Sequence, residues 1–290
     1  MATFEFLHLA LSIPAIGPLD RLLPNTERIV PSESRQAYLS GLFGTRHDFF
    51  YKGTLFSFAP APPDILPPWA RAGFIGKQIQ TLEPAGPDDL FALTPSKKWK
   101  AAFFAVDTRP SRQIIAFEKR GDVGSAENVI SHLIESRLRE RRSASWHVDI
   151  EYVTEKRGFT AAANRFRGQI TELSFEFNPP NALRGFDKFK EFNRLAVAQT
   201  NSEKSEYSLK NKNGSVEPSG DFVDSAVDYA SEGAGQVTMK AGKKIVFNSR
   251  NSKKTATIPE SVMPREGEPT KIAGASNILL NDATNEDRDE

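Results

Sequence analysis

The sequence predicts an α+β protein with antiparallel sheets, helices packed on one face, and a C-terminal half that is ferredoxin-like or related. Short segments in which apolar and polar residues alternate indicate half-buried strands. In the second half of the chain the predicted order is strand, helix, strand, helix and a two-stranded hairpin, which favours an α+β layout with helices on one face of an antiparallel sheet. A chain of 290 residues with 39% hydrophobic and 26% charged residues can bury a core, and its length allows two bodies. We expect an N-terminal part at 1–155, a C-terminal part at 156–254 and a tail at 255–290.

The N-terminal part is predicted to open with a strand over residues 4–13, in which Leu7, Leu9 and Leu11 share one face. Two helices are expected to begin after the N-cap candidates Ser32 and Ser125. Further strands are predicted over residues 49–58, 73–82, 99–106, 113–119 and 146–153. Five prolines between residues 60 and 68 predict a stiff connector within this part.

The C-terminal part is predicted to run strand, helix, strand, helix and then a two-stranded hairpin. The corresponding residues are 170–177, 186–196, 207–212, 221–230, and 237–239 with 245–247. This order favours the ferredoxin-like plan. From residue 255 onward there is no sustained periodicity, prolines recur and the last residues are acidic, so a disordered acidic tail is expected.

The complete absence of cysteine excludes disulfides, thiolate metal sites and cysteine nucleophiles. The first residues contain Glu5 and His8 and no basic segment, which is not typical of a signal peptide. No run approaches the roughly 18 apolar residues of a membrane span. We therefore expect a cytoplasmic protein without membrane contact, and nothing in the sequence calls for a cofactor.

The formal net charge of +1 conceals an uneven distribution along the chain. Residues 255–290 contain eight acids and three bases, a charge of −5, so residues 1–254 carry +6. Residues 240–254 hold six bases and no acid, and residues 97–142 hold eleven bases and six acids. Clustered bases are expected of a protein that binds a phosphate backbone. The candidate nucleic-acid contacts are Lys240, Lys243, Lys244, Arg250, Lys253, Lys254, Arg137, Arg141 and Arg142.

The basic clusters also have a simpler interpretation, because cations at a helix C-terminus or on a solvated face need no ligand. The acidic tail offers a way to choose between the two. If it occupies the basic surface weakly, deletion of residues 255–290 should tighten non-specific nucleic-acid binding.

Three residues with acid–base and metal-binding side chains, His147, Asp149 and Glu151, are spaced by two on a predicted strand and would share one face. Imidazole and carboxylates together suit a divalent metal or general acid–base chemistry, which makes these residues the catalytic candidates of a metal-dependent nuclease. The alternative is an exposed polar face opposite apolar neighbours. No recognised catalytic motif accompanies the three residues, so a protein without enzymatic activity is favoured and no metal is assigned.

Two C-terminal segments, Phe175-Glu-Phe-Asn-Pro-Pro-Asn181 and Gly242-Lys-Lys-Ile-Val-Phe-Asn-Ser-Arg250, flank a phenylalanine-rich predicted helix. This arrangement resembles uncharacterised bacterial proteins of mobile-element and phage-defence neighbourhoods. The resemblance implies a role facing nucleic acid and carries over no residue assignments. The first functional hypothesis is therefore backbone-dominated binding of RNA or single-stranded DNA. The alternatives are an assembly subunit or homo-oligomer that contacts only protein, and the metal-dependent nuclease.

Overall fold

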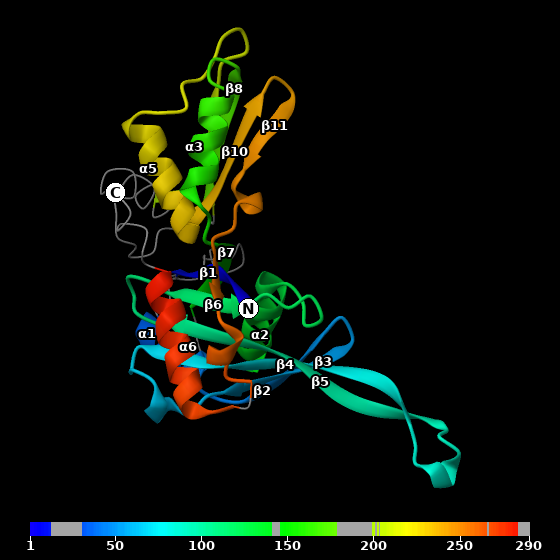
Figure 1. Cartoon of the computed structure of the whole chain (residues 1–290). Helices are drawn as coiled ribbons and strands as arrows, with labels where there is room; N and C mark the ends of the chain where they lie inside the picture. Colours follow the sequence, from blue (N-terminus) through cyan, green and yellow to red (C-terminus); the bar gives the residue numbers. More distant parts are fainter. Residues whose placement is uncertain are drawn as a thin grey trace, which may run out of the picture.

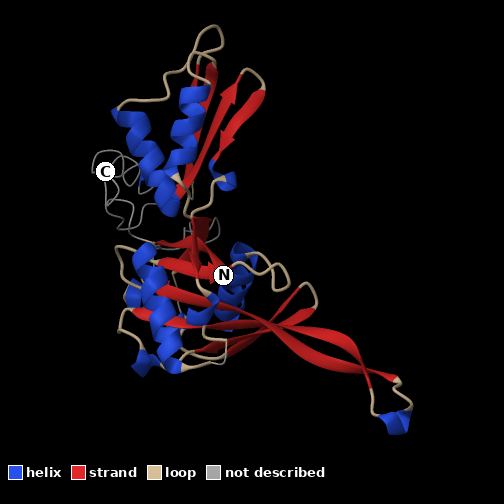
Figure 2. Cartoon of the chain, in the orientation of Figure 1, coloured by secondary structure: helices blue, strands red, loops and turns tan. Residues whose placement is uncertain are grey.

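The chain forms two antiparallel sheets with helices, which confirms the α+β class (Figure 1, Figure 2). The computed structural model describes residues 1–12, 31–140, 146–178, 199–200, 202, 204–265 and 267–283. Within this part of the chain, one sheet has eight strands in the order β12-β1-β6-β5-β4-β3-β2, with β7 also paired to β1. The other has four strands in the order β11-β10-β8-β9.

The eight-stranded sheet uses the N-terminal strands and one late strand. Its strands are β1 (Ala2–Ser12), β2 (His47–Tyr51), β3 (Thr54–Pro60), β4 (Ala70–Pro84), β5 (Leu93–Asp107), β6 (Ile114–Glu118), β7 (His147–Tyr152) and β12 (Thr255–Ile258). Its helices are α1 (Arg35–Leu42), α2 (Ala126–Glu140) and α6 (Pro269–Asp282). The expected strand over 49–58 is in fact the β2–β3 hairpin, because Lys52 and Gly53 adopt positive φ angles of 50° and 74° and form its two-residue turn.

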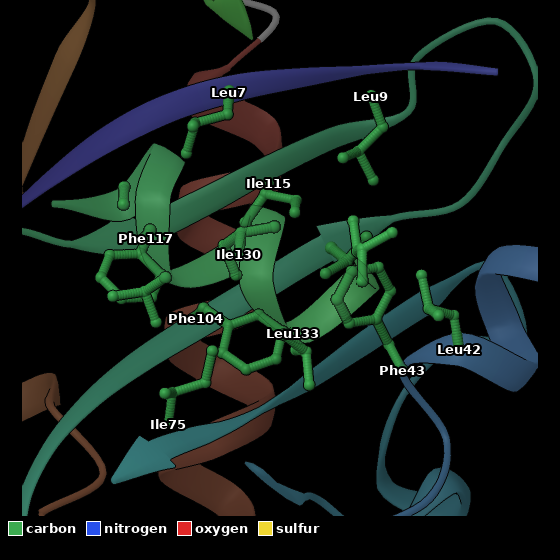
Figure 3. Packing of buried hydrophobic residues seen from close by; sticks show 14 of the residues in the cluster. Leu7, Leu9, Leu42, Phe43, Ile75, Phe104, Ile115, Phe117, Ile130 and Leu133 are labelled. Carbon is green, nitrogen blue, oxygen red and sulfur yellow. The ribbon is translucent and has the colours of Figure 1, made fainter. Parts of the chain in front are cut away.

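The eight-stranded sheet is covered by helices on both faces, so the prediction that helices pack on one face is wrong for this sheet. Leu7, Leu9 and Leu11 of β1 lie in one core with α1 and α2, and Figure 3 shows the side chains of that core. Phe4 and Phe6, which alternate with them, lie in a second core with α6. A strand buried on both faces has apolar residues at both odd and even positions, as β1 does.

The expectation of a disordered tail from residue 255 is also wrong for the described residues. Strand β12 pairs with β1, and α6 buries Ile272, Leu279 and Leu280 against the sheet (Figure 1). Arg265 anchors the segment through two hydrogen bonds, of 3.0 and 2.7 Å, to the buried Glu118 carboxylate. Helix α6 was not predicted because its apolar face is narrow and acidic residues surround it. Residues 284–290 lie outside the described residues. Deleting the segment would uncover a core, so it cannot serve as a simple test of nucleic-acid competition.

Among the described residues, helices pack against one face of the four-stranded sheet. It contains β8 (Ile170–Phe177), β9 (Ser205–Lys210), β10 (Gly235–Ala241) and β11 (Lys244–Asn248), with helices α3 (Lys156–Arg165) and α5 (Asp221–Tyr229). Leu173, Phe175 and Phe177 alternate along β8 and pack against both helices. The ferredoxin-like detail is not confirmed: the described order is α3-β8-β9-α5-β10-β11, and the predicted helix over 186–196 lies outside the described residues.

The two sheets meet where a π-helical turn, η4 (Ala230–Ala234), crosses β1 and β7. Gly233 has a φ of 87° there, and a Cβ atom on it would lie 2.4 Å from the Cβ of His8. Only glycine fits this approach. His8 is fully buried, and the burial lowers its pKa to about 4 against a smaller opposite effect of the Gly233 backbone.

Candidate nucleic-acid interface

Half of the predicted C-terminal basic residues are engaged in contacts within the protein. The ammonium of Lys240 lies 3.1 Å from the carboxylate of Glu172 and lowers its pKa. Lys253 lies 3.4 Å from the centre of the Tyr152 ring and 3.7 Å from the Glu5 carboxylate. Lys254 donates to the Ala283 carbonyl at 3.3 Å. Because these three cations have partners within the protein, they are less available to bind phosphates than cations without such partners.

The remaining three residues of this run are exposed. Lys243 and Lys244 lie at the turn between β10 and β11, and Arg250 lies in the short helix η5 (Ser249–Asn251). Within the described part of the chain, neither lysine is joined to a carboxylate by an ion pair. The turn therefore presents two available cations at the end of the four-stranded sheet.

Of the three arginines predicted as contacts at the end of α2, Arg137 lies within the described residues. The Arg137 guanidinium donates to the backbone carbonyls of Thr45 and Arg46, the latter at 3.2 Å. It therefore ties α2 to the loop that precedes β2. Arg141 and Arg142 lie outside the described residues.

The three catalytic candidates lie on β7 but do not converge on one point. His147 Nε2 is 3.3 Å from Asp149 Oδ1, whereas the Glu151 carboxylate accepts from the Gln236 amide at 3.3 and 3.4 Å. Burial raises the pKa of Glu151. Among the described residues, no group of three or more His, Cys, Asp or Glu side chains could hold a metal ion. The nuclease hypothesis therefore keeps a His–Asp pair but no assembled metal site.

Within the described residues, the outer half of the β4–β5 hairpin extends beyond the body, and we call it the arm (residues 77–100; Figure 1). Its first pair, Lys77 opposite Lys100, still lies beside Phe56 of β3. The pairing runs without interruption from Ala70 opposite Asp107 to Pro84 opposite Leu93. The inner half of the hairpin is buried in the sheet, whereas the outer half leaves the body and is largely exposed. The arm therefore has two sheet faces that no other described element covers.

The arm carries four lysines and one exposed tryptophan. Lys97 and Trp99 share one face of the ribbon, and Lys77, Lys98 and Lys100 share the other, because Lys77 pairs with Lys100 across the strands. Trp99 is 47% exposed. Lys98 forms an ion pair with Glu83. Sequence analysis found the basic block that begins at Lys97 but not this surface. The sequence does contain a pattern that is typical of a long hairpin: two long alternating segments on either side of a Pro-Asp-Asp turn.

Comparisons of the chain with protein-family models, with curated proteins and with solved structures gave no match. Across the described residues, no helix has the length and apolar character needed to cross a membrane.

Proposed function

We propose that the protein binds single-stranded nucleic acid, RNA or DNA, mainly through the phosphate backbone and with the arm as its principal contact surface. The observation that carries the proposal is the exposed Trp99 beside Lys97 on one face of a two-stranded ribbon whose other face carries Lys98 and Lys100. Proteins that bind single strands without sequence preference combine an exposed aromatic ring, on which a base stacks, with cations that follow the backbone. The arm supplies both.

The electrostatics of the arm favour an anionic ligand. Among the described residues, Lys77, Lys97 and Lys100 form no ion pair with a carboxylate, although Lys100 lies close enough to Asp122 to contribute to the lowering of its pKa by Arg120. Lys77 and Lys100 are directly opposite one another, and like charges in such a pair repel unless an anion lies between them. A phosphate chain running along the ribbon would relieve this repulsion and release counterions.

The test compares two variants with the same change in formal charge. Lys97→Glu with Lys100→Glu alters the arm, and Lys243→Glu with Lys244→Glu alters the β10–β11 turn. Binding of a fluorescent single-stranded oligonucleotide is measured by anisotropy over a series of salt concentrations. We expect the arm variant to bind at least tenfold more weakly and to reduce the salt slope by about 1.4, since each phosphate contact contributes about 0.7 for single strands. A smaller loss is expected for the turn variant.

The stacking contribution is tested separately by Trp99→Ala. Loss of one base–aromatic stack costs about 1–3 kcal/mol and should weaken binding by roughly five- to 150-fold without changing the salt slope. Wild-type affinity in both the arm variant and Trp99→Ala would exclude the arm as the site. A larger loss in the turn variant would move the site to Lys243 and Lys244. A preference for duplex DNA would indicate a ribbon that enters the major groove.

The biological setting belongs to the proposal as well. The sequence resemblance to proteins of phage-defence neighbourhoods suggests that the bound nucleic acid arises during infection. Protection of bacteria from phage by the wild-type gene, and its loss in the arm variant, would support that setting.

A further inference from the structure

The end of the arm has a different chemical character from the lysine-bearing stem. This tip (residues 82–93) exposes four large apolar side chains to solvent: Leu82, Leu90, Phe91 and Leu93. Leu90 is 89% exposed and Phe91 is 64% exposed. Asp88 and Asp89 are the charged residues beside them at the turn, and residues 84–93 contain no base. Contiguous apolar side chains next to charged residues are typical of a protein-binding surface.

The backbone of the tip holds these side chains in place at some cost. Leu90 and Phe91 adopt positive φ angles of 49° and 56°, in the left-handed region that side chains other than glycine, asparagine and aspartate rarely occupy. Two consecutive residues in this region make the tip backbone strained. The conformation directs apolar groups away from the body, where the described chain has nothing for them to contact.

The charges of the molecule select the surface that fits the tip. Two tips meeting symmetrically would bring Asp88 and Asp89 of both copies together, and like charges disfavour that contact. The β10–β11 turn has the complementary character: Lys243 and Lys244 are exposed, and Ile245 beside them is 53% exposed. It lies in the run of residues 240–254 that contains no acid.

We propose that the tip of the arm in one copy docks on the β10–β11 turn of a second copy of this chain, with Asp88 and Asp89 facing Lys243 and Lys244 and with Leu90 and Phe91 against Ile245. The tip and the turn lie at opposite ends of the molecule, so the contact joins different copies (Figure 1). Such a head-to-tail contact uses two different patches and generates a ring or an open filament rather than a two-fold dimer. The patches are small, so the association is weak, concentration-dependent and sensitive to salt.

The test is a charge exchange on full-length protein that has been freed of nucleic acid by nuclease and high salt. One variant carries Asp88→Lys and Asp89→Lys, and the second carries Lys243→Glu and Lys244→Glu. Sedimentation velocity at low salt should show wild-type protein associating beyond its mass of 32.2 kDa as concentration rises. Each variant alone should remain monomeric, because in each the tip and the turn have charges of the same sign.

An equimolar mixture of the two variants should associate again, because the reversed tip of the first fits the reversed turn of the second. The chain with all four substitutions should also associate by itself. Phe91→Ser is the apolar control and should weaken association while nucleic-acid binding remains at the wild-type level. A wild-type protein that stays monomeric at all concentrations would overturn the proposal, as would a mixture that stays monomeric. Association that appears only when oligonucleotide is added would show that nucleic acid, rather than the tip, occupies the turn.

Discussion

The two sheets of the protein differ in how their faces are covered. The eight-stranded sheet buries both faces, one under α1 and α2 and the other under α6, whereas the four-stranded sheet buries one face under α3 and α5. In this protein the second face of the eight-stranded sheet is covered by the last helix, α6. The four-stranded sheet is completed within residues 156–248. The difference shows that an acidic C-terminal segment can be an essential layer of a core formed at the N-terminus.

Removal of residues 255–290 should produce the largest difference in stability between the two sheets. The truncation exposes Phe4, Phe6 and Phe103 and removes the partner of Glu118. We expect protection from hydrogen exchange to be lost in β1, β5 and β6 and largely retained in β8 and β10, since the core of the four-stranded sheet contains no residue from the deleted segment. Exchange measured by mass spectrometry checks this. Equal loss in both sheets would show that they unfold as one cooperative unit.

Substitution of Arg265 should have the next largest effect. Arg265→Ala leaves the buried Glu118 carboxylate without its cation. Because Arg265 itself is partly exposed, we expect a cost of about 1–3 kcal/mol. Glu260→Ala removes an exposed partner of the same arginine and should have a much smaller effect. Urea denaturation measures both. Similar free energies of unfolding for the two variants would contradict an anchoring role for the Arg265–Glu118 pair.

The smallest effect near neutral pH concerns His8, which lies where the two sheets meet. Its pKa is about 4 in the folded protein and 6.5 ordinarily, so below pH 6.5 the unfolded chain binds a proton that the folded chain does not. The free energy of unfolding should therefore fall by about 3 kcal/mol between pH 6.5 and pH 4, and by little more below that. This loss should be absent in His8→Leu.

Much of the local structure could be predicted from the sequence. The strand at β1, the helix after Ser125 and the β10–β11 hairpin follow from alternation, helical spacing and turn residues. Helix α1 was predicted as well, although its N-cap is Ser34 rather than Ser32. Helix α3 was missed because its sequence resembles a basic loop, and α6 was missed because prolines and acids surround a narrow apolar face.

The candidate site was less predictable than the fold. The charge pattern located runs of bases along the chain, but it could not show which of these bases have partners within the protein. Lys240 and Lys253 each find a carboxylate from a segment more than 60 residues away, Glu172 and Glu5 respectively. The arm could not be recognised from the sequence, because its lysines and Trp99 come together on one ribbon only when β4 and β5 pair beyond the edge of the body.

The sequence by itself determined the α+β class, the absence of thiol chemistry and the presence of unevenly distributed charge, because these properties depend on composition and on contacts between near neighbours. Only the tertiary structure decided which cations face solvent, that the C-terminal helix closes a core and that the arm leaves the body. These properties depend on pairs of residues far apart in the chain. Their contacts form only when the sheets fold and bury one surface against another.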